Sequence, residues 1–266
     1  KKTIGGASVS IIILLIIGML SGAWMISGVV PTMIYYGIQI MSPKFFLVST
    51  CAICALVSVM TGSSWTTIAT IGVALVGIGT AQGYEPGWIA GAIISGAYFG
   101  DKVSPLSDTT VLASSSSGTP LFTHIRFMMV TTVPSFIITL TIFLVVSILH
   151  TNAGTVQGAD FSRDLLGTYN ITPWLFIVPV LTAILIIKKV SAIATLFIAS
   201  VIAGIAALIF QPQILMSIAS GSPVNASASL DFMSGFKGLF ISYYGSTAIE
   251  TGNEALNSLV STRGMT

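Results

Sequence analysis

Charged and hydroxyl side chains gather in one short stretch of this sequence, Gly100 to Gly118, which reads GDKVSPLSDTTVLASSSSG. The stretch holds Asp101, Lys102, Pro105 and Asp108 between segments that are otherwise apolar. Charge is scarce elsewhere, since only 7% of all residues are charged. An ionisable side chain at membrane depth is costly and usually faces a cavity or a pathway. We therefore expect this stretch to carry the chemistry of the protein.

Pro105 predicts a break in the backbone within this stretch. Proline removes an amide donor and disfavours helical geometry at the preceding residue, Ser104. Ser107 or Asp108 would then cap a new helix that starts one or two residues further on. Broken backbone at membrane depth persists only where it is buried in protein or lines a water-filled cavity. Such a break offers carbonyl and hydroxyl oxygens to a cation, and a carboxylate supplies the compensating charge.

Of the two aspartates, Asp108 is the stronger candidate for a cation ligand, because hydroxyl residues flank it and apolar residues follow it. The alternative for this position is an aqueous loop followed by a well-capped helix. Asp101 and Lys102 are adjacent and close to a predicted membrane interface. They are therefore either an interfacial pair or part of the site.

A second group of hydroxyls begins the segment TGSSWTTIATIGVALVGIG, from Thr61 to Gly79. Lipid offers these hydroxyls no partner, so their density predicts that they line a cavity. The alternative is that they bond back to carbonyls of their own helix, as single Ser and Thr residues often do. The residues concerned are Thr61, Ser63, Ser64, Thr66, Thr67 and Thr70.

The elements that must position these residues are membrane spans. With 54% hydrophobic residues and a mean hydropathy of +0.97 over 266 residues, the chain has too little polar surface for a water-soluble globule. The sequence therefore predicts a polytopic membrane protein. A net charge of +2 and the lack of a basic run argue against a nucleic-acid partner.

Apolar runs of spanning length mark most of these elements. Ser8 to Ile40 is longer than one span needs, and Gly28 and Pro31 predict a break near Ser27 to Thr32; a long tilted helix with a proline kink is the alternative. Pro86 to Phe99 is barely long enough to cross. The remaining predicted spans are 44–60, 127–149, 174–187 and 190–210, and Cys51 and Cys54 are expected to serve helix packing.

Two further groups of titratable residues have open interpretations. His124 and Arg126 precede a span, as cytoplasmic anchors do, although a histidine there also suits a proton sensor. Glu250 and Glu254 lie four residues apart, on one face of a helix. They indicate either an interfacial amphipathic helix or a lining of the same pathway.

Motifs of intramembrane hydrolases are missing from the sequence. There is no HExxH and no GxSxG, and Tyr98-Phe99-Gly100 before Asp101 lacks the first glycine of a GxGD aspartyl-protease motif. We therefore expect a transporter and no enzyme. A passive channel is the alternative, and a flux that saturates and reverses with the proton gradient would argue against it.

The motif GDKVSPLSDTT, with TGSSWTTIATIGVAL and AGAIISGAYF before it and HIRFMMVTTVP after it, resembles the NhaC-type sodium/proton antiporters. That family belongs to the ion transporter superfamily and is similar in sequence to a malate/lactate-type antiporter. The likeness covers nearly the whole chain. It implies an all-α fold of two inverted repeats, each with a re-entrant hairpin and an interrupted helix, in a cell membrane such as the bacterial inner membrane.

By the same resemblance, the ion-binding residues fall in both polar segments. Sodium is expected at Asp108, and the transported Na+ and H+ are the only small partners, with no cofactor. Family members begin earlier and continue into a second half, so the chain is expected to be partial: residues 1–149 a first repeat, 150–235 connecting spans and 236–266 the start of a second repeat. A homodimer or a second half would complete it. The expected ligand positions are Asp108, Ser104, Ser107, Thr109, Thr110, Asp101, Thr61, Ser63, Ser64 and Thr66.

The predicted function is exchange of sodium for protons, in which the two cations compete for one carboxylate and two access states each bind one cargo at a time. The alternative is sodium- or proton-coupled exchange of small organic anions such as malate and lactate. That reaction needs a cationic anchor or a helix N-terminus beside the ion site, and Lys102 or the helix start at Thr109 would serve.

Overall fold

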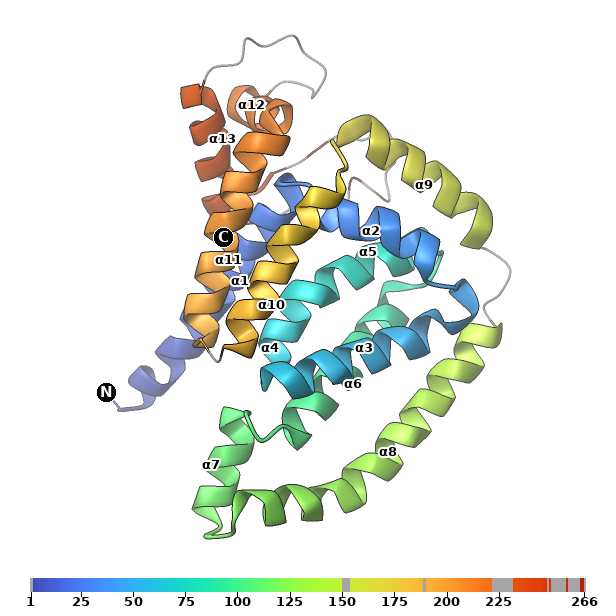
Figure 1. The fold of residues 1–266 in the computed structure, drawn as a ribbon, viewed down its shortest axis with the longest axis vertical. Helices are drawn as coiled ribbons and strands as arrows, with labels where there is room; N and C mark the ends of the chain where they lie inside the picture. The colour runs from blue at the N-terminus through green and yellow to red at the C-terminus, as the bar shows by residue number, and fades with distance from the viewer. Residues whose placement is uncertain are drawn as a thin grey trace. The chain divides into compact units, whose positions relative to one another are not determined.

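A computed structural model describes residues 2–149, 154–188, 190–221, 232–247, 249, 257 and 264–265 of the chain. The described residues are mostly helical and contain no β-strand (Figure 1). Their contacts form two compact units, residues 36–158 and residues 1–35 with 159–266. These units group residues by packing, and the division into repeats at 149 and 235 stays a prediction. Glu250 and Glu254 lie outside the described residues, as does Lys189.

Several helices are long and apolar enough to cross a membrane, which confirms an all-α polytopic membrane protein. Among the described residues there are four: Pro43–Thr61, Ser64–Ala81, Leu121–Leu149 and Ile193–Phe210. Two bent pairs raise the number to six if each pair is one span, namely Ile11–Ile26 with Val29–Ile40 and Phe161–Thr168 with Pro173–Ile187.

The unit of residues 36–158 is built around one closely packed helix pair, α3 and α6. Helix α8 packs on both members of this pair. Two short connections, residues 62–63 and 104–107, interrupt the helices on either side of them. The elements are η1 (Pro43–Phe45), α3 (Phe46–Thr61), α4 (Ser64–Thr67), the π-helical turn η2 (Ile68–Gly72), α5 (Val73–Ala81), α6 (Pro86–Val103), α7 (Asp108–Ser116) and α8 (Leu121–Leu149).

Glycines allow the backbones of α3 and α6 to touch. A Cβ atom at Gly96 would overlap the Cys51 carbonyl oxygen, and one at Gly100 would overlap that of Ala55. The Ser58 hydroxyl donates to the Ala97 carbonyl of α6 at 2.5 Å. Glycines four residues apart on one helix face are what allow two helix backbones to approach so closely. Cys51 and its neighbour Cys54 are buried free thiols in this interface, as the packing interpretation predicts.

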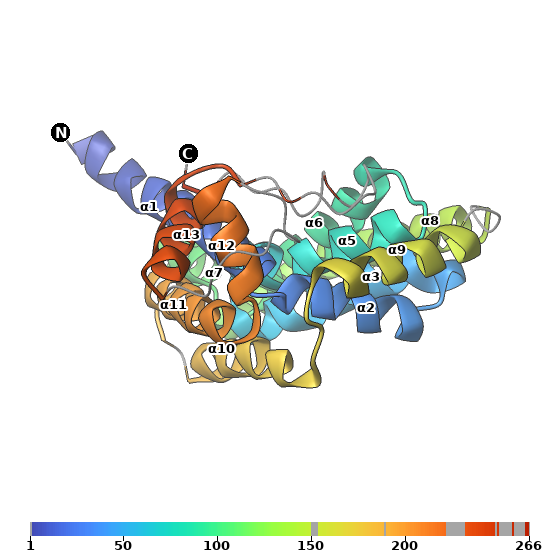
Figure 2. The same cartoon turned by 90° about the horizontal axis from the view of Figure 1, so that it is seen from above.

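In the other unit, the helices pack mainly as pairs. Helix α1 lies against α11, α10 against α11, and α12 against α13, and the last pair is side by side in both views (Figures 1 and 2). The elements are α1 (Lys2–Ile26), α2 (Val29–Ile40), α9 (Gly154–Thr168), η3 (Pro173–Phe176), α10 (Ile177–Ile187), α11 (Ala192–Phe210), α12 (Pro212–Ser220) and α13 (Phe232–Tyr244), of which α2 and α9 continue into the first unit.

The break predicted near Ser27 to Thr32 is confirmed. Helices α1 and α2 meet at an angle of 68°, and Gly28 between them has a φ of +80°. A Cβ atom at Gly28 would overlap Nε2 of Gln211. That nitrogen donates to the Asn170 carbonyl at 2.9 Å. Gln211, which connects α11 and α12, is therefore held in place against the break between α1 and α2.

Candidate ion-binding site

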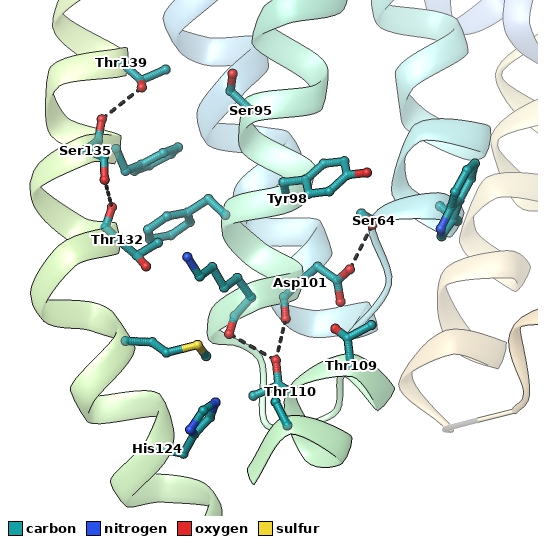
Figure 3. Close-up of a pocket in the computed structure, with 16 residues that line it drawn as sticks. Ser64, Ser95, Tyr98, Asp101, Thr109, Thr110, His124, Thr132, Ser135 and Thr139 are labelled. Atoms are coloured by element: carbon teal, nitrogen blue, oxygen red, sulfur yellow. Dashed lines mark hydrogen bonds between the residues drawn. The ribbon is translucent and has the colours of Figure 1, made fainter. Parts of the chain in front are cut away.

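A cavity of about 620 Å³ lies within the unit of residues 36–158, between α4, α6, α7 and α8 (Figure 3). Its polar lining comes from all four helices, and its apolar lining includes Trp65, Phe99 and Phe136. The last two rings stack between α6 and α8 with centroids 3.9 Å apart. The polar lining residues are Ser64, Ser95, Tyr98, Asp101, Lys102, Thr109, Thr110, His124, Thr132, Ser135 and Thr139.

Asp101 is the carboxylate that lines this cavity. Helix α6 continues through Val103, four residues beyond the predicted end of its apolar run, and so carries Asp101 on its last turn. The buried Ser64 donates its hydroxyl hydrogen to Oδ2 of Asp101 at 2.8 Å (Figure 3). The chain thus brings together two residues that are 37 positions apart.

The helix break at Pro105 is confirmed. Ser104 ends α6 in extended geometry, with φ −76° and ψ 130°. Its hydroxyl donates to the Val59 carbonyl of α3 at 2.7 Å and accepts from the amide of Leu106 at 3.2 Å. Gly62, in the break that ends α3, has a φ of +67°, and a Cβ atom there would lie 2.7 Å from the carbonyl carbon of Leu106. The two helix breaks therefore pack directly against each other.

Helix α7 begins with the predicted cap. The Ser107 hydroxyl accepts from the Thr110 amide at 3.5 Å and lies 2.8 Å from the Thr109 hydroxyl. The Thr110 hydroxyl donates back to the Lys102 carbonyl at 3.1 Å, which ties α7 to the end of α6. Asp108 is exposed in the first turn and does not line the cavity.

The expected ligand residues thus divide between two environments. Asp101, Ser64, Thr109 and Thr110 line the cavity, whereas Asp108, Ser104, Ser107, Thr61, Ser63 and Thr66 do not. Their roles as cation ligands stay predictions.

Most hydroxyls of the 61–70 cluster bond within their own segment, which is the alternative considered for them. Ser63 caps α4 by accepting from the Thr66 amide at 3.3 Å. The Thr67 hydroxyl donates to the Ser63 carbonyl at 3.0 Å, and that of Thr70 to the Thr66 carbonyl at 2.7 Å. Thr61 Oγ1 likewise contacts the Ser63 carbonyl at 3.2 Å.

The sequence did not lead us to expect that α8 lines the cavity, because the 127–149 segment looked uniformly apolar. His124, Thr132, Ser135 and Thr139 all line the cavity from this helix. Their spacing of eight, three and four residues places them on one helical face, a signal that the sequence did contain. Nε2 of His124 and Oγ1 of Thr132 are buried and have no hydrogen-bond partner among the described residues.

Comparison with protein families gives one match that covers more than half of the chain. The family model described as the Na+/H+ antiporter family matches residues 96–241, a region that includes Asp101, the Pro105 break and α8. No solved structure matches the chain.

Curated relatives agree with this match. The chain is 38% identical over 96% of its length to the Na(+)/H(+) antiporter NhaC of Alkalihalophilus pseudofirmus, covering 51% of that protein. It is 40% identical over 76% of its length to the malate-2H(+)/Na(+)-lactate antiporter of Bacillus subtilis, covering 44%. It is 33% identical over 96% of its length to the arginine/ornithine antiporter ArcD of Halobacterium salinarum, covering 49%. The chain thus spans about half the length of these relatives.

Proposed function

Because the chain belongs to the Na+/H+ antiporter family, we propose that it contributes the carboxylate site of a secondary transporter that exchanges sodium for protons. The site is Asp101 with Ser64 and Thr110, at the junction of α6, α4 and α7. The apolar helices and the family make the chain part of a multi-pass cell-membrane protein. Its relatives are named as transporters and not as enzymes.

The observation that carries this proposal is the direction of the hydrogen bonds that the Ser64 and Thr110 hydroxyls make. Ser64 donates its hydrogen to the Asp101 carboxylate, and Thr110 donates its hydrogen to a backbone carbonyl. Each hydroxyl oxygen then presents only lone pairs to the cavity. The Ser64 oxygen lies beside the carboxylate, and the Thr110 oxygen lies 3.4 Å from the backbone carbonyl oxygen of the same residue, Asp101. Such oxygens are hard ligands that suit Na+. A proton that binds Asp101 removes the negative charge, so Na+ and H+ exclude each other from the site.

The alternative function, exchange of small organic anions, is supported by two features of the same cavity. Lys102 lines it, and about 620 Å³ is within the usual range for small-molecule sites. The orientation of the hydroxyls favours the cation, however, because their hydrogens are already used.

We also propose that a second half completes the transporter. The chain spans about half the length of its relatives, so further spans would supply the second inverted repeat expected from the resemblance. A second copy of this chain is the alternative partner. Crosslinking in membranes distinguishes a homodimer from a single longer polypeptide.

The experiment compares the two aspartates of the same stretch. We reconstitute the full-length protein in liposomes and follow internal pH after Na+ pulses, with Asp101→Asn and Asp108→Asn as a matched pair. Asp101→Asn should abolish Na+-driven proton flux, whereas Asp108→Asn should retain most of it because that side chain is exposed. Loss of flux in Asp108→Asn alone would return the site to Asp108. Proton flux driven by lactate without Na+ would favour the organic anion.

A further inference from the structure

The chain passes between its two compact units at two places, and each crossing lies within a helix. One crossing falls in α2, between residues 35 and 36, and the other falls in α9, between residues 158 and 159. The unit of residues 36–158 contains Asp101 and its cavity, and these two helices are its covalent connections to the rest of the chain. A change in the orientation of this unit must therefore be accommodated in or next to α2 and α9.

Each of these helices adjoins a sharp break that belongs to the other unit. Helix α2 follows Gly28, where the chain bends by 68° and φ is +80°. Helix α9 ends at Thr168, and the chain bends by 92° before the helical segment that starts at Pro173. Hinges are commonly a few residues at the ends of helices, because a change in their backbone angles turns the whole helix. Both breaks therefore lie where hinges of α2 and α9 are expected.

A single side chain, that of the buried Gln211 between α11 and α12, contacts both breaks. Its Oε1 accepts from the Asn170 amide at 3.1 Å, and its Nε2 donates to the Asn170 carbonyl at 2.9 Å. The same Nε2 lies against Gly28, where a Cβ atom would overlap it. Gln211 thus pairs with the main chain of one break as a peptide group does, and it packs on the main chain of the other. One residue therefore holds the two breaks together.

Polar groups close to the two breaks are poorly satisfied in this conformation. Within four residues of the breaks, four buried side-chain atoms have no hydrogen-bond partner among the described residues. Unpaired buried polar groups are costly and rare, and a store of strain is one recognised reason for them. They favour a second arrangement of the breaks in which these groups find partners. The atoms are Nε1 of Trp24, Oγ1 of Thr32, the hydroxyl oxygen of Tyr169 and Oγ1 of Thr172.

We propose that residues 27–28 and 169–172 are paired hinges on which the unit of residues 36–158 turns as one body, and that Gln211 is the positioning residue that makes them turn together. This inference rests on the proposed exchange of sodium for protons and adds the segments that convert one access state into the other. Asp101, Ser64 and Thr110 all lie within the turning unit, so the turn changes the side from which the site is reached and leaves its ligands unchanged.

The chain offers two matched controls for Gln211. Gln82 is also a buried glutamine whose Nε2 donates to a main-chain carbonyl, that of Met41 at 2.8 Å, but this bond lies within the unit of residues 36–158. Asn170→Ala removes the side chain beside Gln211 and leaves both bonds of Gln211 in place, because these bonds go to the main chain of residue 170. An effect that is specific to the hinges should therefore appear in Gln211→Leu and in neither control.

The first test measures the maximal proton flux and its Na+ dependence in the full-length protein in liposomes. Gln211→Leu keeps the approximate size of the side chain and removes both bonds to Asn170, so the two hinges turn independently. We expect the maximal flux to fall about tenfold, equivalent to about 1.4 kcal/mol of activation free energy, and the half-saturating Na+ concentration to stay unchanged. Gln82→Leu and Asn170→Ala should keep the wild-type maximal flux. An unchanged maximal flux in Gln211→Leu, or an equal loss in Gln82→Leu, overturns the role of Gln211.

The second test does not depend on transport. Ser116 and Ser220 are exposed and belong to different units, so spin labels are attached by Ser116→Cys and Ser220→Cys. The distance between the labels is measured by electron paramagnetic resonance in the full-length protein, with and without Na+. The unsubstituted protein is the blank because Cys51 and Cys54 are buried. The control is a pair within one unit, Glu85→Cys with Ser116→Cys.

Wild type should show two distances between residues 116 and 220 and one distance between residues 85 and 116. Gln211→Leu should broaden the first distribution and leave the second unchanged. If wild type shows two distances but no exchange of sodium for protons, the exchange proposal fails and the hinges stand. A single distance between residues 116 and 220, both with Na+ and without it, overturns the hinges. Two distances that Gln211→Leu leaves unchanged overturn the role of Gln211.

Discussion

Gly100→Ala should lower the free energy of unfolding, although it adds only a single methyl group to a helix. Gly100 lies where α6 touches α3, one residue before Asp101. The new Cβ would overlap the Ala55 carbonyl oxygen and lie 2.5 Å from Ser58 Cβ and 2.7 Å from the Val59 amide nitrogen. Two of these three neighbours are backbone atoms, so the clash is relieved only if the two helices move apart.

The size of the effect follows from three contributions. Overpacking a tight interface costs about 1–3 kcal/mol. Separation of the helices also weakens the hydrogen bond from Ser58 to the Ala97 carbonyl, worth about 1 kcal/mol. Alanine favours the helix over glycine by roughly 1 kcal/mol, which offsets the second loss. We therefore expect the free energy of unfolding to fall by about 1–3 kcal/mol, the overpacking cost alone.

The assay is denaturant unfolding in detergent micelles, with Gly87→Ala in the same helix as the control. A Cβ atom at Gly87 meets nothing within 4 Å, so this substitution should be neutral or slightly stabilising. Because displacement of α6 also moves Asp101 away from Ser64, Gly100→Ala should weaken Na+ binding and Gly87→Ala should not. If both variants unfold at the same denaturant concentration, the contact between α3 and α6 is not as close as described.

Two further predictions concern single residues. Ser64→Ala removes the hydroxyl that donates to Asp101, and hydrogen bonds to charged groups are worth about 1.5–3 kcal/mol. We therefore expect activation of the flux by Na+ to become about tenfold weaker. Ser64→Thr should restore the activation, and failure of this rescue would contradict a role for the oxygen. Gly28→Ala should destabilise the protein by about 1–3 kcal/mol because of its positive φ, with an additional cost from overlap with Gln211. Gly221→Ala has a similar φ of +68° and open space around it, so an equal loss there would show that the contact with Gln211 contributes nothing.

Local chemistry was sufficient to predict the helix breaks. Pro105 forces extended geometry on Ser104, and Ser107 caps the next helix, because both effects depend on residues within one turn. The break at Gly28 follows in the same way from a residue that tolerates positive φ.

The choice of residues facing the cavity depended on contacts that no local pattern reveals. Asp101 lines it because α6 continues to Val103 and because α4, which begins at Ser64, packs against α6. Asp108 had the more suggestive neighbours in the sequence, yet its helical position points it out of the cavity. The spacing of Thr132, Ser135 and Thr139 on α8 could have indicated a polar face, but only if the helix was known to line a cavity.

The glycine contact between α3 and α6 also fixes the register in which the carboxylate is presented. One turn before Gly96 the same face of α6 carries Ala92, and one turn after Gly100 the helix has already ended at Ser104, which also bears a Cβ atom. Sliding α6 by a turn would therefore bring a Cβ atom to a place where only hydrogen fits. The contacts of Gly96 and Gly100 with α3 therefore fix the position of Asp101 along α3. Deletion of one residue between Ala92 and Gly100 would rotate Asp101 by about 100° around the helix axis and turn it away from Ser64 without changing its identity.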